Sequence, residues 1–395
     1  MVIAIMMRAM DQDSGFRAIV ENLVENLIQQ SNKHFFLLIY NSRKNFGRFA
    51  NYKNVKEVLA RLKNKFIWDQ LIVPYIAVKE KADLIFNPKF SVPLFSPVPV
   101  AMCLQENGFF TNPQYYEKLD VLYQRIMMPL YVKKSDILFS ISKYALEINK
   151  KILNINPKKI EILYSGVNEK FKPIDDNYEI QKFKQKYTLP EKFILSVTRV
   201  DHPGIQGSTS FYGGKNPEVT YRAFKKIRNK IPHYLVFAGK RIKEYLEYTE
   251  GNDADFTRII FTDFIQYDEM PLLFNAADLF VNAAPNEGFG MVNVEAMACG
   301  KAVVLADSGA SAEVGENAAI FAQAGNVNDF AEKILFILSH PEDKALAEKA
   351  SLNKVKEFSL KKSARKCIEI FERKIIPSES NHSNLIYHGG GDVGT

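Results

Sequence analysis

The chain has 395 residues, of which 47% are hydrophobic, 12% aromatic and 25% charged, a globular composition that excludes an intrinsically disordered chain. No apolar run reaches the roughly 18 residues of a transmembrane helix, and three widely separated cysteines (Cys103, Cys299 and Cys367) exclude a disulfide framework and a CxxC metal site. The net charge of +7 is concentrated in residues 1–170, where 24 Lys or Arg face 15 Asp or Glu, and it predicts an anionic partner.

Short apolar runs alternate with longer amphipathic runs along the chain. The N-terminal run, residues 1–7, lacks a basic region and predicts a strand rather than a signal peptide. The predicted strands are 2–6, 35–40, 82–86, 98–104, 136–142, 160–167, 193–197, 234–239, 259–264, 279–284, 302–306 and 319–322. The predicted helices are 16–28, 144–153, 217–230, 269–277, 327–338 and a long pattern over 342–374.

Strand–helix alternation in both halves predicts an α/β protein with two parallel, doubly wound sheets. We therefore expect two Rossmann-like domains of similar size, facing each other across a cleft. The expected divisions are an N-terminal domain (1–170), a polar linker with two prolines (171–192), a C-terminal domain (193–358), a last helix (359–376) and a disordered tail (377–395).

The most specific motif lies after the strand that ends near Ala284. A glycine turn, Gly288-Phe289-Gly290, leads into a helix and leaves the backbone N–H groups of Gly290, Met291 and Val292 at its N-terminus, where they suit a phosphate or a polar sugar group. Glu287 and Glu295 bracket this turn, and each carboxylate can accept hydrogen bonds from sugar hydroxyls. Two glutamates eight residues apart around this turn favour a binding site over a solvated turn.

This segment resembles the glutamate-x7-glutamate motif of the retaining glycosyltransferases of family 4, and the similarity extends from the first strand to about Lys374. Further matches are Ser14-Gly15-Phe16, Ser142, Ser165-Gly166-Val167-Asn168, Val236-Phe237-Ala238-Gly239 and Glu313-Val314. The resemblance implies the GT-B fold, with the last helix crossing back to the N-terminal domain. It also implies a nucleotide-sugar donor held by the C-terminal domain and an acceptor bound by the N-terminal domain.

The resemblance assigns roles to individual residues. Arg199 and Lys215 bind the donor diphosphate and, with Glu287, form the catalytic set; such cations can stabilise a leaving diphosphate without a metal. Glu295 holds the nucleotide ribose. Glu287 and the backbone from Phe289 to Val292 position the donor sugar, and Gly15 closes the site from the N-terminal side. The glycine-rich insertion 201–214 is either a lid or a surface loop.

The sequence departs from the family after the strand 98–104. Many relatives carry His-Asp there, whereas this chain carries Gln105-Glu106, which we expect near the sugar or acceptor. Gln105 can form hydrogen bonds but cannot titrate. A retaining front-side displacement, in which the leaving phosphate takes the acceptor proton, needs no enzyme base.

Neither DxD sequence, at 11–13 or 253–255, predicts a metal site, because acidic turns are common. We therefore expect no cofactor besides the nucleotide sugar, and no nucleic-acid partner. The basic residues Lys53, Lys56, Arg61, Lys63 and Lys65 precede Trp68 and are compatible either with a helix on an anionic membrane or with a solvated face. The family favours the membrane, at the cytoplasmic face.

We predict a retaining, metal-independent hexosyltransferase that moves a sugar from a UDP- or GDP-sugar to a glycan or lipid-linked glycan. This reaction belongs to cell-surface polysaccharide, lipopolysaccharide or glycolipid biosynthesis. Two alternatives remain open: a nucleotide-sugar epimerase of the same fold, and a non-catalytic protein that binds nucleotide sugars. The absence of a histidine at Gln105 disfavours the epimerase, which needs an acid/base pair beside the sugar.

Overall fold

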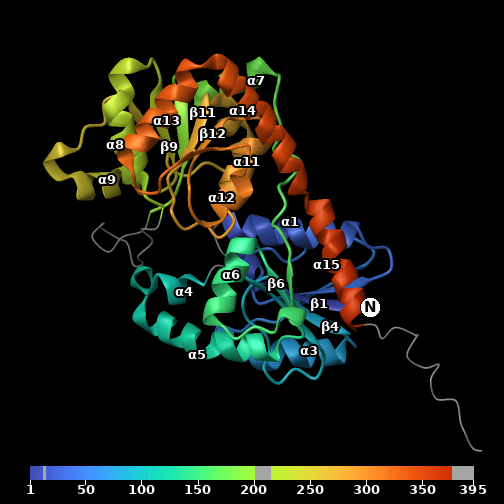
Figure 1. The fold of residues 1–395 in the computed structure, drawn as a ribbon. Helices are drawn as coiled ribbons and strands as arrows, with labels where there is room; N and C mark the ends of the chain where they lie inside the picture. The colour runs from blue at the N-terminus through green and yellow to red at the C-terminus, as the bar shows by residue number, and fades with distance from the viewer. Residues whose placement is uncertain (12–14, 106, 201–214, 376–395) are drawn as a thin grey trace, which may run out of the picture.

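The computed structural model describes residues 1–11, 15–105, 107–200 and 215–375, which form two lobes (Figure 1). Each lobe is built on one sheet in which every strand pair is parallel, as the strand–helix alternation predicted. In Figure 1 the N-terminal lobe lies below the C-terminal lobe, and the helix α15 (Leu360–Ile375) runs from the upper lobe along the lower one.

The N-terminal sheet has seven strands in the order β3-β2-β1-β4-β5-β6-β7. Its strands are β1 (Val2–Met6), β2 (Phe35–Tyr40), β3 (Val55–Leu59), β4 (Leu84–Asn87), β5 (Val100–Leu104), β6 (Ile137–Ser140) and β7 (Ile160–Ile162). The order changes direction at β1, which has β2 on one side and β4 on the other. In such sheets ligands bind beyond the carboxyl ends of the strands near this point.

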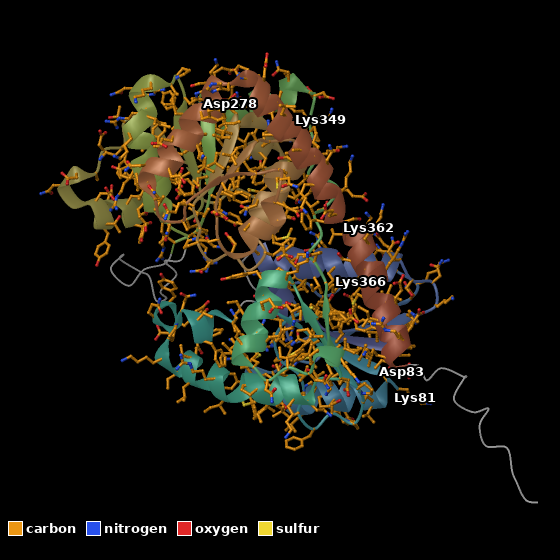
Figure 2. The ribbon with its side chains drawn as sticks, in the orientation of Figure 1. Lys81, Asp83, Asp278, Lys349, Lys362 and Lys366 are labelled. Atoms are coloured by element: carbon orange, nitrogen blue, oxygen red, sulfur yellow. The ribbon has the colours of Figure 1, made fainter. Side chains whose placement is uncertain are left out.

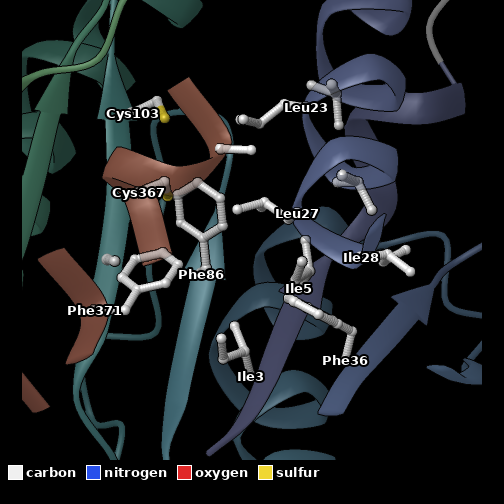
Figure 3. Packing of buried hydrophobic residues seen from close by; sticks show 14 of the residues in the cluster. Ile3, Ile5, Leu23, Leu27, Ile28, Phe36, Phe86, Cys103, Cys367 and Phe371 are labelled. Atoms are coloured by element: carbon white, nitrogen blue, oxygen red, sulfur yellow. The ribbon is translucent and has the colours of Figure 1, made fainter. Parts of the chain in front are cut away.

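Two layers of helices bury the faces of this sheet. On one face, α1 (Gly15–Gln29) and α15 pack over Ile5, Phe86 and Phe139 (Figure 3). On the other face, α3 (Val73–Lys79) and α5 (Lys118–Lys134) contribute inward side chains such as Ile76 and Tyr131. Burial on both faces explains why β1, β2 and β5 are almost continuously apolar.

The C-terminal sheet has six strands in the order β10-β9-β8-β11-β12-β13. These are β8 (Phe193–Val197), β9 (Tyr234–Ala238), β10 (Ile259–Phe261), β11 (Leu279–Asn282), β12 (Val303–Ala306) and β13 (Ile320–Ala322). The helices α8 (Pro217–Ile227), α9 (Ile242–Glu250) and α13 (Val327–Ser339) cover one face. The helices α10 (Met270–Ala276) and α11 (Met291–Ala298) cover the other.

Shorter or peripheral helices complete the chain. They are η1 (Met7–Asp11), α2 (Lys65–Ile67), η2 (Trp68–Ile72), α4 (Gly108–Thr111), η3 (Pro113–Tyr115), α6 (Lys143–Ile152), η4 (Pro157–Lys159), α7 (Asn177–Lys186), η5 (Arg228–Lys230), η6 (Gly251–Asp253), α12 (Gly309–Gly315), α14 (Pro341–Lys354) and η7 (Val355–Glu357). The helix α7 lies within the segment 171–192 that we expected to be a linker, and its Phe183 is buried.

The chain returns to the N-terminal lobe through Phe358 and Ser359, so the predicted helix 342–374 is in fact interrupted. Val167 donates its N–H to the Phe358 carbonyl at 2.9 Å and pairs with Ser359 in an isolated parallel bridge. A side chain at Gly166 would clash with the backbone of Leu360, because a Cβ there would lie 2.2 Å from the Leu360 nitrogen. The helix α15, with Lys362 and Lys366 labelled in Figure 2, then packs against α1.

The basic segment that precedes Trp68 is not a helix, so this prediction was wrong. Residues 55–59 form the edge strand β3, which pairs with β2. Trp68 is fully buried, and its indole nitrogen donates to the Ala60 carbonyl at 2.8 Å. A buried indole cannot insert into a bilayer, so any membrane contact has to use other side chains.

Candidate active site between the lobes

The segment from Pro285 to Gly290 connects β11 to α11 and forms the centre of the candidate site. Gly290 begins the helix with φ +81° and ψ +57°, a left-handed conformation that favours glycine. A Cβ on Gly290 would lie 2.6 Å from the Asn293 side-chain nitrogen, so this position leaves no room for a side chain. The N–H groups of Met291 and Val292 belong to the first helical turn, which has no intrahelical acceptor for them.

Glu287 and Lys215, two residues of the predicted catalytic set, are in contact. The Lys215 ammonium lies 2.6 Å from Glu287 Oε2, and the Glu287 side chain is nearly buried. Lys215 lies just before α8, which begins at the carboxyl side of β8. The structure therefore brings together a cation and a carboxylate that are 72 residues apart in the chain.

A buried amide network holds the other oxygen of Glu287. The Asn282 side-chain amide donates to Glu287 Oε1 at 3.2 Å and to Asn293 Oδ1 at 2.7 Å. Asn293 in turn donates to the Ser311 hydroxyl at 3.1 Å. The network fixes the carboxylate orientation at little cost, since these buried amides have hydrogen-bond partners. Sequence analysis missed Asn282 and Asn293; a single amide in each otherwise apolar segment was the available signal.

Glu295 is also buried, but it lies in a different environment. Burial raises the pKa of its carboxyl to about 8, opposed by a hydrogen bond from Tyr267 and by the charge of Lys170. The Tyr267 hydroxyl accepts a hydrogen bond from Asn22 of α1 at 3.4 Å, and Asn22 accepts one from Asn168 at 2.8 Å. This chain of polar groups links the second glutamate to the N-terminal lobe.

The remaining predicted residues have the following positions. Arg199 is exposed two residues after β8, and Gly15 is the first residue of α1. The Phe289 ring is buried and packs between Tyr164 and Phe358, at centroid distances of 6.1 and 5.4 Å. Gln105 follows β5, and its backbone carbonyl accepts a hydrogen bond from Asn149 at 2.7 Å. Glu106 and the insertion 201–214 lie outside the described residues.

Two side chains connect the glycine turn and the helix α12 to the N-terminal lobe. The Ser142 hydroxyl, at the N-cap of α6, donates to the Gly288 carbonyl at 2.7 Å. Glu313 of α12 accepts the backbone N–H groups of Lys143 and Tyr144, both at 3.0 Å, and the Tyr164 hydroxyl at 2.7 Å. A carboxylate at a helix N-terminus interacts favourably with the helix dipole. We name this set of contacts the interlobe clamp.

A second charged cluster, which sequence analysis did not single out, lies at the carboxyl ends of β1 and β4. Arg8 donates to Asp69 at 2.8 Å, and the Ser91 hydroxyl donates to the same oxygen at 3.0 Å. Lys89 follows β4, and burial together with the charges of Arg8 and Lys65 lowers its pKa to about 8. Within the described part of the chain, Arg8 Nε is buried without a hydrogen-bond partner.

The described residues contain no group of three or more His, Cys, Asp or Glu side chains placed to hold a metal ion. Asp255, from one of the two DxD sequences, pairs with Arg228, which holds the pKa of its carboxyl well below the usual range. None of the helices formed by the described residues is long and apolar enough to cross a membrane.

Comparison with known proteins identifies the class of the C-terminal lobe. Residues 208–354 match the family described as glycosyl transferases group 1, so the chain contains a domain of this family. Over 94% of its length the chain superposes on the whole of Anabaena Alr3699/HepE, solved in complex with UDP-glucose, with a TM-score of 0.69 and 16% identity. The fold is therefore GT-B, as the resemblance implied.

Two curated relatives match this chain over part of its length at low identity. The serotype-specific mannosyltransferase WbdA of Escherichia coli is 28% identical over 241 residues, which are 59% of this chain and 27% of WbdA. A Campylobacter jejuni N-acetylgalactosaminyltransferase, named for a diphospho-undecaprenol-linked acceptor, is 26% identical over 252 residues, 63% of each chain. The matched region is thus about a quarter of WbdA.

The clamp yields a prediction about stability. Glu313→Ala removes the acceptor shared by two backbone N–H groups and a tyrosine hydroxyl, so we expect the free energy of unfolding to fall by about 1–3 kcal/mol. Chemical denaturation followed by fluorescence measures this change. Glu332→Ala, an exposed change on α13, is the matched control and is expected to stay within about 0.5 kcal/mol. Equal effects of the two variants would contradict a structural role for the clamp.

Glu295 yields a prediction about pH. A carboxyl whose pKa is raised on folding stabilises the protein fully below its unfolded pKa, and this contribution is lost as pH rises toward about 8. Glu295→Gln mimics the protonated form at every pH. We therefore expect the variant to gain about 1–3 kcal/mol in unfolding free energy over the wild type between pH 5 and pH 8. A difference that does not change with pH would mean that Glu295 is ionised throughout.

Proposed function

We propose that the protein is a retaining glycosyltransferase that transfers a hexose from a UDP- or GDP-sugar to a glycan or lipid-linked glycan. The single observation that carries the proposal is the contact between the half-buried Lys215 and the buried Glu287, whose carboxylate the Asn282 amide holds beside the N-terminus of α11. A cation, a fixed carboxylate and helix N–H groups at one point can bind both a diphosphate and sugar hydroxyls.

In this proposal the donor diphosphate binds Lys215, Arg199 and the N–H groups of Met291 and Val292. Glu287 binds hydroxyls of the donor sugar, Glu295 the ribose, and Gly15 closes the site from the N-terminal side, with Gln105 and Glu106 near the sugar. The bond between the anomeric carbon and the phosphate oxygen breaks, and the acceptor oxygen attacks on the same face. Its proton passes to the leaving phosphate, so no side-chain base and no metal is required. The cations stabilise the negative charge that develops on the phosphate.

The relatives support the two substrate classes. HepE was solved with UDP-glucose, and the Campylobacter enzyme is named for a lipid diphosphate-linked acceptor. WbdA is named as a serotype-specific mannosyltransferase, which favours a role in the synthesis of a surface polysaccharide. We therefore place the reaction at the cytoplasmic face of a membrane, with the basic N-terminal lobe in peripheral contact with it.

We assign the anionic part of the acceptor to the cluster of Arg8 and Lys89. These cations follow neighbouring strands of the N-terminal sheet, at the edge where such sheets bind ligands. A phosphate of the acceptor would bind the Arg8 guanidinium and the Lys89 ammonium at this edge.

The donor half of the proposal is tested by nucleotide release. The protein is incubated with a panel of UDP- and GDP-sugars and membranes that carry lipid-linked glycans, and UDP or GDP is measured. We expect release with one donor, reduced about 100- to 1,000-fold in Lys215→Ala and Glu287→Ala. Lys243→Ala and Glu247→Ala, an exposed ion pair on α9, are matched controls without effect. Failure to bind any nucleotide sugar would refute the proposal, and donor interconversion without nucleotide release would indicate an epimerase.

The acceptor half is tested by pH and by one substitution. Lys89 is charged below about pH 8, so kcat/KM for a phosphorylated acceptor should fall as pH rises through that value. Lys89→Gln should raise the acceptor KM about tenfold and flatten this limb of the profile, with donor affinity unchanged. Lys79→Gln on the exposed side of α3 is the control. An unaltered acceptor KM in Lys89→Gln would remove the cluster from the acceptor site.

A further inference from the structure

The helix α6 contains one fully buried polar side chain, that of Asn149. Its side-chain nitrogen donates to the Gln105 carbonyl at 2.7 Å, and its side-chain oxygen accepts a hydrogen bond from the Asn107 amide at 2.5 Å. Asparagine is less favourable than leucine in a helix interior, and a buried amide costs free energy unless it forms hydrogen bonds. The amide at this position is therefore explained by its contacts with the neighbouring segment rather than by the helix.

Gln105 and Asn107 are the described residues of the connection between β5 and α4. Gln105 directly follows β5, and Asn107 directly precedes α4. Asn107 is buried, and its carbonyl accepts the backbone N–H groups of Phe110 and Thr111 at 2.9 and 3.2 Å. Asn107 thus begins the helix α4 while its side chain is bound to Asn149. One side chain of α6 therefore holds both ends of this connection.

The N-terminus of the same helix holds the glycine turn of the other lobe. Ser142, the N-cap, donates to the Gly288 carbonyl at 2.7 Å, and Glu313 accepts the first N–H groups of the helix. Ser142 and Asn149 are seven residues apart, close to two helical turns, so they lie on one face and about 10 Å apart along the axis. In Figure 1, α6 lies beside α4 and extends toward α12. The helix α6 therefore connects the glycine turn to the end of β5.

The two connected segments have complementary tasks in the proposed reaction. The glycine turn binds the donor, whereas Gln105 lies near the sugar or the acceptor. The acceptor oxygen has to approach the anomeric carbon on the face that the leaving phosphate occupies, and a displacement of about 1 Å can lower the rate about 100-fold. A rigid helix with one contact to each segment is suited to set this distance.

We propose that Asn149 is a positioning residue for sugar transfer. Through Gln105 and Asn107 it holds the acceptor side of the site at a fixed distance from the donor turn that Ser142 holds. Because Asn149 is fully buried, it acts only through these partners. The donor and acceptor sides are those of the proposed function, on which this inference rests. Asn282 orients the donor-side carboxylate, so we expect donor binding to be independent of Asn149.

The test compares sugar transfer with hydrolysis of the same donor. In hydrolysis a water oxygen bonds to the anomeric carbon, the bond from that carbon to the phosphate oxygen breaks, and one water proton passes to the leaving nucleoside diphosphate. Asn149→Leu keeps the size of the side chain and removes both of its hydrogen bonds. With membranes that carry lipid-linked glycans, we expect kcat for transfer to fall about 10- to 100-fold. The Kd for UDP or GDP and the rate of hydrolysis without membranes should change less than about twofold.

The double variant Asn107→Leu/Asn149→Leu separates positioning from folding. In Asn149→Leu the Asn107 amide is buried without its partner, so the midpoint of thermal denaturation should fall. Replacing both residues removes the unsatisfied amide and should restore most of this midpoint. Transfer should nevertheless stay slow in the double variant, because the Gln105 carbonyl still lacks its donor. Recovery of transfer together with stability would overturn the proposal.

Asn54→Leu is the matched control. Asn54 precedes β3 at the opposite edge of the same sheet, and its amide also donates to two backbone carbonyls, those of Ile28 and Ser31, at 3.1 and 3.0 Å. This variant should lower the midpoint of denaturation without changing the ratio of transfer to hydrolysis. The same unchanged ratio in Asn149→Leu would reduce Asn149 to a structural residue and overturn the proposal.

Failure of the proposed function has a different signature. It would appear as a wild-type protein that neither transfers nor hydrolyses any donor. Backbone amide hydrogen exchange of residues 107–116 then decides whether Asn149 holds this segment. We expect faster exchange there in Asn149→Leu than in the wild type or in Asn54→Leu, because α4 loses the side chain that fixes its start. Equal exchange in all three proteins would refute the positioning role as well.

Discussion

The structure depends on the interlobe clamp, because the glycine turn of the candidate site belongs to one lobe while part of its support comes from the other. Ser142 binds the Gly288 carbonyl, and Glu313 caps the helix that Ser142 begins. The two contacts are reciprocal: each lobe supplies a side chain that satisfies backbone groups of the other. Each such hydrogen bond contributes only about 1 kcal/mol. The clamp is therefore strong enough to define one arrangement of the lobes and weak enough to open.

The aromatic contacts around Phe289 make the clamp continuous with the core. Phe289 packs against Tyr164, whose hydroxyl binds Glu313, and against Phe358, where the chain returns to the N-terminal lobe. The side chain of Phe289 is thus structural, while its neighbours Glu287 and Gly290 shape the candidate site. The two residues therefore have different tasks in the turn: Gly290 adopts the left-handed backbone conformation at the start of α11, and the Phe289 ring anchors the segment.

Short apolar runs in the sequence were sufficient to predict most of the strands, because parallel strands that are buried on both faces are uniformly apolar. The same patterns failed at the sheet edge, where β3 carries the charged pair Lys56-Glu57 between two valines, and at α5, which exposes leucine and isoleucine side chains. The resemblance assigned Lys215 and Glu287 to one donor site, and the two side chains are in contact, although 72 residues separate them in the chain. The contact between Glu295 and Tyr267 and the cluster of Arg8 with Asp69 arise from long-range packing, which no local spacing reports.

The two glutamates of the motif show how burial separates groups that the sequence presents as equivalent. Glu287 is buried next to a cation and an amide, so its carboxylate charge is compensated within the protein. Glu295 is buried beside a tyrosine and has only the more distant Lys170 to offset its charge, so its proton is held up to about pH 8. A protonated carboxyl can donate as well as accept, and the Tyr267–Asn22 contact extends this group to α1. The Tyr267 hydroxyl thus contacts Glu295 and Asn22 of α1 together, so the buried carboxyl that holds its proton is separated from the N-terminal lobe by one side chain.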